Sequence, residues 1–208
     1  MAVKCDNSLD KDRHITKGSL AKAVKYAVDN GAEVINISYS APKSKFDNED
    51  NFSELEKEIK RAIAADVCVV CAAGSVAGTN VRYPAGFPGV IGVGATWKNG
   101  KLAEYSNEST AVDIVAPGGY ENGARTYMAS PTTINPKGYR YSEGTSYATP
   151  LVAGTIAMML SINCTLSPSQ ILSRLQDRST STVCGRINKS KKFKVLNAGK
   201  SVALMKEE

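Results

Sequence analysis

The chain has 208 residues, of which 42% are hydrophobic and 22% are charged. This is the composition of an ordinary globular domain, and it excludes an intrinsically disordered chain. The net charge of +6 comes from 26 basic and 20 acidic residues, and much of the excess lies between Arg186 and Lys194. No recognised nucleic-acid-binding motif accompanies these charges, so we interpret them as a solvated loop and expect no nucleic acid partner.

Hydrophobic runs in the chain are too short for a membrane span. The longest lie at Val67–Ala73 and Ala153–Leu160, whereas a spanning helix needs roughly 20 residues. The first residues lack the apolar segment of a secretory signal peptide. We therefore expect no membrane partner. The five scattered cysteines favour a reducing compartment, but the localisation itself stays open.

Cys68 and Cys71 have the C-x-x-C spacing of redox and zinc sites. They lie, however, within an apolar run that is typical of a buried strand. Residues three apart on a strand point to opposite faces, so this pair cannot chelate one ion. We interpret both as buried free thiols. Since no phosphate-binding glycine loop occurs either, we predict no metal and no cofactor.

Short β-type runs alternate with helical periods along the chain, which predicts an α/β fold. The continuous apolar run at Val67–Ala73 indicates a parallel sheet with helices on both faces. We expect the other strands at Ala2–Cys5, Glu33–Ser38, Val90–Thr96 and Val112–Ala116. We expect helices at Ser19–Val28, from Ser53 onward, at Tyr147–Ser161, after Ser167–Pro168 and within Val195–Met205.

Ser146 lies where a loop enters the long apolar helix, within Gly144–Pro150. At the start of a helix, a hydroxyl and its backbone amide face the positive end of the helix dipole. This position suits a nucleophile whose attack creates an oxyanion. A serine at a helix start is also a common cap, so the chemistry alone leaves both interpretations open.

The surrounding sequence resembles the subtilisin-like serine proteases. Gly144–Gly154 matches G-T-S-x-A-T-P-x-V-A-G, the signature around the nucleophile of that family. Further matching blocks precede it in the family's order, at Ala23–Ser38, Val69–Gly74, Tyr83–Ala95 and Val112–Gly118. The resemblance implies a three-layer α/β/α fold with a mostly parallel central sheet. Residues 1–208 would form one incomplete domain of this type, with its N-terminal strands missing.

The resemblance also implies roles for single residues. Ser146 matches the nucleophile, and Ser75 stands where the family has the asparagine of the oxyanion hole. Five residues match the walls of the S1 pocket, which receives the side chain before the cleaved bond. They are Ser38, Tyr39 and Ser40 on the edge that pairs with an extended peptide, and Ala73 and Gly74 on the opposite wall. Ser40 and Ala41 replace two family glycines, so we expect a narrowed pocket.

Two departures from the family pattern weigh against catalysis by this chain alone. The family's histidine base and its aspartate precede the first matched strand, and neither motif occurs here. The only histidine, His14, lies in a charged segment that does not resemble the catalytic one. Replacing the oxyanion asparagine by Ser75 removes a donor whose loss costs roughly 10²–10³-fold in turnover, an effect measured in this same family.

Two functions are therefore open. The chain is either the nucleophile-bearing fragment of a serine endopeptidase, inactive when isolated, or a pseudoprotease that binds peptides or regulates a partner without cleaving. Both imply an extended peptide or protein as a partner. The missing strands would expose a sheet edge at Val34–Ser38, which we expect to be covered by a shifted Ala2–Cys5, a second copy or an N-terminal fragment.

Overall fold

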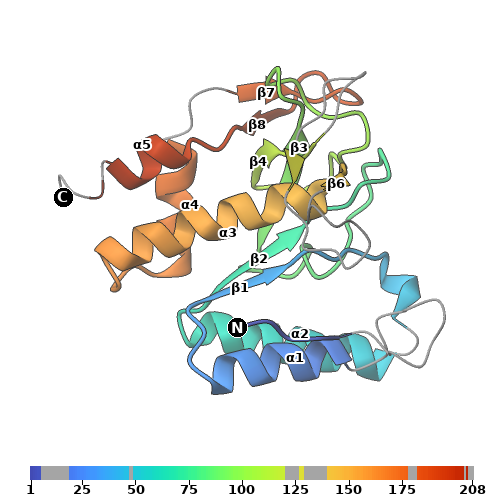
Figure 1. Cartoon of the computed structure of the whole chain (residues 1–208). Helices are drawn as coiled ribbons and strands as arrows, with labels where there is room; N and C mark the ends of the chain where they lie inside the picture. The colour runs from blue at the N-terminus through green and yellow to red at the C-terminus, as the bar shows by residue number, and fades with distance from the viewer. Residues whose placement is uncertain are drawn as a thin grey trace.

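The structure is a computed structural model of the whole chain, and we describe residues 1–5, 19–46, 49–119, 127–128, 140–177, 182–203 and 205. Helices pack against both faces of one central sheet, which gives three layers (Figure 1). The elements in chain order are α1 (Ser19–Asp29), β1 (Val34–Ile37), the short 3₁₀ helix η1 (Lys43–Lys45), α2 (Glu49–Ala64), β2 (Cys68–Ala72), β3 (Ile91–Thr96), β4 (Ile114–Pro117), β5 (Tyr127–Met128), β6 (Arg140–Tyr141), α3 (Thr145–Ile162), α4 (Pro168–Asp177), β7 (Thr182–Cys184), β8 (Lys192–Lys194) and α5 (Ala198–Ala203).

The central sheet has four parallel strands in the order β1-β2-β3-β4. Every residue of β2 and β3 is buried, because α1 and α2 cover one face and α3 covers the other. The predicted α/β fold with a parallel sheet is thus confirmed.

The two cysteines of the C-x-x-C spacing lie in β2 on opposite faces of the sheet. Cys71 belongs to the core beneath α1 and α2, whereas Cys68 belongs to the core beneath α3. Both are free thiols. Burial raises the pKa of Cys68 to about 11 and raises the pKa of Cys71 well above its usual range. The interpretation as buried neutral thiols is confirmed.

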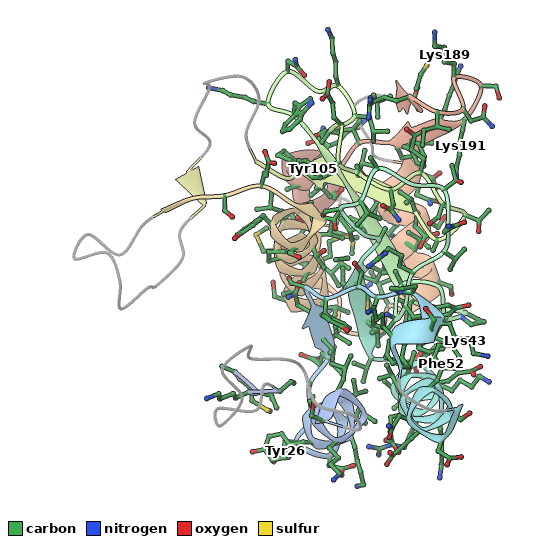
Figure 2. The ribbon with its side chains drawn as sticks, turned by 90° about the vertical axis from the view of Figure 1, so that its right-hand side faces the viewer. Tyr26, Lys43, Phe52, Tyr105, Lys189 and Lys191 are labelled. Carbon is green, nitrogen blue, oxygen red and sulfur yellow. The ribbon has the colours of Figure 1, made fainter. Side chains whose placement is uncertain are left out.

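Two of the predicted elements differ from the structure. Residues 1–5 form no strand, and β1 pairs with β2 alone among the described strands. Helix α2 begins at Glu49 rather than at the capping pattern that opens at Ser53. Phe52 accounts for the earlier start, because its ring is buried against Tyr83 and Phe87 and this packing fixes the first turn of the helix. In Figure 2 Phe52 lies beside Lys43, whose ammonium is 4.8 Å from the centre of the ring.

The basic stretch near the C-terminus exposes Arg186, Lys189, Lys192 and Lys194 to solvent, as expected, but it is not simply a loop. It contains β8 and the turn of an antiparallel hairpin with β7. Phe193 is buried in the core, and the Lys191 ammonium donates to the Ser109 carbonyl at 2.6 Å. Lys189 and Lys191 mark this end of the molecule in Figure 2. The hairpin is therefore an integral part of the fold.

Helix α3 crosses the sheet and is the one described helix long and apolar enough, by length and composition, to span a membrane. Half of this span is buried inside the fold. Its buried residues, which include Val152, Ile156 and Met159, pack on β2 and β3. This is the position of a core helix.

Candidate active site

The first turn of α3 presents Ser146 at the carboxyl end of the sheet. Gly144 precedes the helix with φ 142°, a conformation that favours glycine, and offers no capping side chain. Ser75, which follows β2, supplies the cap instead, because its Oγ accepts a hydrogen bond from the Thr145 amide at 2.9 Å. The Thr145 hydroxyl lies 3.1 Å from the same Ser75 oxygen. Thus Ser75 stabilises the start of the helix that carries Ser146.

Ser146 and Ser38 are joined by two reciprocal hydrogen bonds. The Ser146 hydroxyl donates to the Ser38 carbonyl at 3.0 Å, and the Ser38 hydroxyl donates to the Ser146 carbonyl at 2.8 Å. That carbonyl is accessible because its helical partner would be the amide of residue 150, and Pro150 has none. Pro150 therefore leaves this carbonyl free to bind Ser38, which directly follows β1.

Gly74 and Asn107 determine the conformation of the loop after β2. Gly74 has φ 113°, and a Cβ there would lie 2.9 Å from the Asn107 side-chain nitrogen. The buried Asn107 side chain accepts hydrogen bonds from the Val76 amide at 3.1 Å and from the Gly78 amide at 3.4 Å. Because this one amide organises the whole loop, it also positions Ser75.

The other predicted wall follows β1. Tyr39 is half-buried and packs against the core beneath α1 and α2. Ala41, which replaces one of the two family glycines, forms an antiparallel bridge in which the main chains of Ala41 and Tyr83 exchange hydrogen bonds of 2.9 and 2.8 Å. The Ser40 carbonyl accepts a hydrogen bond from the Arg82 guanidinium at 3.2 Å.

The structure thus brings the predicted site residues into one region. Ser146 touches Ser38, Ser75 touches the neighbour of Ser146, and Gly74 donates its amide to the Thr145 hydroxyl at 3.3 Å. His14 lies outside the described residues. Among the residues that the structure describes, no group of three or more His, Cys, Asp or Glu could hold a metal ion.

Comparison with known proteins shows the family of this chain. A sequence profile of the subtilase family matches residues 2–197, which include Ser146 and both predicted pocket walls. The chain belongs to the subtilase family. Subtilisin BL from Lederbergia lenta is 34% identical over 163 residues, which cover 78% of this chain and 55% of that protein. The thermophilic serine proteinase from Bacillus sp. (strain AK1) is 33% identical over 186 residues, 87% of this chain and 42% of that protein.

Solved structures give the same answer. The patellamide maturation protease PatA aligns with a TM-score of 0.75 and 27% identity, covering 95% of this chain and 72% of that chain. The self-cleaved protease domain of PatA aligns with a TM-score of 0.72 and 29% identity. This subtilase chain spans about half the length of the curated relatives that it matches.

The sequence analysis did not predict the roles of three residues that contact or shape the candidate site. Asn107 orders the loop that carries Ser75, yet nothing in its sequence context distinguishes it from a surface asparagine. Arg82 connects to both walls of the predicted pocket, and only the fold brings those segments together. The role of Pro150 could have been found, because a proline in a helix always leaves the carbonyl four residues earlier without its amide partner.

Proposed function

We propose that this chain supplies the nucleophile and the substrate groove of a subtilisin-like peptidase domain, and that it does not hydrolyse peptides when isolated. The observation that carries this proposal is the hydrogen bond from the Ser146 hydroxyl to the Ser38 carbonyl at 3.0 Å. A carbonyl oxygen cannot remove the hydroxyl proton, and the sequence contains only one histidine, outside the matching catalytic motif. Without a base, a serine hydroxyl is a weak nucleophile.

When a base is supplied from outside these residues, the geometry supports acyl transfer. The base takes the Ser146 proton, the Ser146 oxygen forms a bond to the carbonyl carbon of the peptide, and that carbonyl becomes an oxyanion. The oxyanion can bind the Ser146 amide, which has no partner within the first turn of α3. The carbon–nitrogen bond then breaks, the base returns the proton to the amine, and water releases the acyl group.

Ser75 has a proposed part in this step. Its side-chain oxygen accepts a hydrogen bond from the Thr145 amide and lies next to the Thr145 hydroxyl. When both of these donate to it, Ser75 keeps its own proton to donate toward an oxyanion. A serine reaches less far than the family's asparagine, so we expect weaker stabilisation than in a typical subtilisin.

The edge strand β1 is the reason to propose a partner that completes the domain. The Cys68 amide donates to the Glu33 carbonyl at 2.9 Å, so by the parallel-sheet pattern the backbone groups of Val34 and Asn36 face away from β2. A groove of about 760 Å³ runs along this edge, lined by apolar side chains that include Val3, Leu20, Val24, Val34, Ile35 and Ile37. Since the relatives are nearly twice as long as their match to this chain, we propose a polypeptide with the rest of the domain as occupant.

A pseudoprotease remains the second candidate function. The observation that favours it is Ser75 in place of the oxyanion asparagine, together with pocket walls built entirely from this chain. Peptide binding by these walls requires neither a base nor an aspartate. The two candidates differ in one respect, since only the first gains activity when the remaining segment is supplied.

Peptide hydrolysis tests the main proposal. The chain and its Ser146→Ala variant are incubated with a library of fluorogenic peptides at neutral pH, and the release of fluorophore is followed. We expect equal background rates from both proteins. Turnover by the wild-type chain that Ser146→Ala abolishes would show that a base exists within these 208 residues and would refute the claim of inactivity.

A further inference from the structure

Arg82 spans the space between the two walls of the predicted S1 pocket. Its guanidinium donates to the Ser40 carbonyl at 3.2 Å. Its side-chain stem lies against Gly74, where a Cβ would come within 2.4 Å of the Arg82 Cδ. The bridge between Ala41 and Tyr83 holds the adjacent backbone in place on the Ser40 side. Arg82 therefore contacts both predicted walls of the S1 pocket, through Ser40 on one side and Gly74 on the other.

The charge of Arg82 lacks an anionic partner among the described residues. The ion pairs there involve other residues, and the one recorded acceptor of Arg82 is the neutral Ser40 carbonyl. The Arg82 Nε is buried and has no hydrogen-bond partner. A guanidinium has five N–H donors, arranged to match a carboxylate with two parallel hydrogen bonds. The half-buried side chain thus leaves an unused anion-binding group in the pocket.

We propose that Arg82 makes this groove select peptides with glutamate or aspartate at the residue whose side chain enters the S1 pocket. The inference rests on the proposed function, because the pocket is the peptide site of that function. A carboxylate would pair with the accessible part of the guanidinium, whereas an apolar side chain would leave this charge without an anionic partner. A lysine or arginine side chain would meet a like charge at short range.

Binding, rather than cleavage, tests this inference, since the isolated chain is expected to be inactive. The probes are three fluorescent octapeptides, blocked at both ends, that differ only in one central residue: glutamate, glutamine or lysine. Fluorescence anisotropy gives the Kd of each for the full chain. We expect the glutamate peptide to bind roughly tenfold more tightly than the glutamine peptide, as one charge-assisted hydrogen-bond pair predicts, and the lysine peptide to bind more weakly still.

Arg82→Glu provides the decisive variant, because it should reverse the order and favour the lysine peptide. Arg82→Gln should abolish the discrimination between glutamate and lysine. The matched control is Lys98→Glu, which changes the net charge equally at an exposed position after β3 and should keep the wild-type order. Thermal unfolding of each variant verifies that it is folded.

Each outcome separates the two proposals. Equal binding of all three peptides by the wild-type chain, or an order that Arg82→Glu leaves unchanged, overturns the role of Arg82 and leaves the groove intact. Failure of every peptide to bind at millimolar concentration overturns both the acidic selectivity and the isolated peptide site. Neither result bears on catalytic inactivity, which the hydrolysis assay measures separately.

Discussion

Ser38 connects the sheet to α3 through the Ser146 carbonyl, which in a regular helix would accept a backbone amide. In an α-helix the Ser146 carbonyl would accept the amide of residue 150, but Pro150 has no amide hydrogen, and the Ser38 hydroxyl donates to this carbonyl instead. The same pair fixes the Ser146 hydroxyl on the Ser38 carbonyl. Pro150 thereby frees the carbonyl through which Ser38 is held against Ser146.

A double-mutant cycle tests this dependence at the residue scale. Ser38→Ala removes the donor to the Ser146 carbonyl and should lower the free energy of unfolding by about 1 kcal/mol. In a Pro150→Ala background the restored amide can bond the same carbonyl, so Ser38→Ala should cost at least ~0.5 kcal/mol less. Urea unfolding of the four proteins measures the difference. Additive effects would contradict the claim that Pro150 and Ser38 share this carbonyl.

The sequence predicted which residues lie together better than it predicted their contacts. Ser146 was predicted as the nucleophile through the resemblance of Gly144–Gly154 to the family signature, and that role stays a prediction. Arg82 was missed because its partners, Gly74 and Ser40, are brought to it only by the sheet. Nothing in the sequence around Ser75 revealed that its hydroxyl caps a helix 70 residues later.

Among the structural elements, the β7–β8 hairpin is attached to the domain through a buried carboxylate. Glu108 is only 4% exposed, and its oxygens accept hydrogen bonds from the Arg186 amide at 2.8 Å and the Ile187 amide at 3.0 Å. The Lys191 ammonium donates to the Glu108 backbone carbonyl at 3.2 Å. The turn of the hairpin thus surrounds an anion supplied by the loop before β4.

Neutralising Glu108 should loosen this hairpin. Glu108→Gln keeps the shape but points an amide N–H₂ group at backbone amides, leaving at least one buried donor unsatisfied, so we expect a loss of about 1–3 kcal/mol in the free energy of unfolding. Glu104→Gln is the matched control, because its side chain is exposed. Urea denaturation compares the two. A Glu108→Gln protein as stable as the control would show that the buried carboxylate is not needed.

Elements with a strong apolar period were predicted and those with a polar sequence were not. The core strands and α3 followed from their hydrophobic runs, with bounds that shift by a few residues. The hairpin was missed although Lys192, Phe193 and Lys194 alternate, with only Phe193 buried. An alternation over only three residues is too short to predict a strand within a cluster of positive charges. The strand expected at Ala2–Cys5 fails because no neighbouring strand pairs with it among the described residues.

At the scale of the whole molecule, β1 is an edge strand of the central sheet among the described strands. The groove along that edge combines apolar side chains with strand backbone that pairs with β2 alone in the described part of the chain, and such an edge readily accepts a further strand. Of the coverings that we considered, a shifted Ala2–Cys5 strand is not present in the structure. A second copy and a separate segment remain to be distinguished.

Hydrogen exchange at β1 makes this distinction. In the dilute monomer, the amides of Ile35 and Ile37 should be protected by β2, whereas those of Val34 and Asn36 should exchange rapidly. Light scattering verifies the oligomeric state of the same sample. Slow exchange of all four amides in the monomer would mean that the chain covers its own edge. Protection that grows with concentration would favour a second copy over the proposed segment.

The central claim is that Ser146 occupies the nucleophile position of a subtilase but is not reactive in this chain alone. Labelling with a fluorophosphonate probe tests it directly, since the probe forms a stable adduct only with an activated serine, and mass spectrometry locates the modified residue. We predict no adduct on Ser146 in the wild-type chain at neutral pH, the same result as for Ser146→Ala. An adduct on Ser146 that is absent from Ser146→Ala would contradict the account.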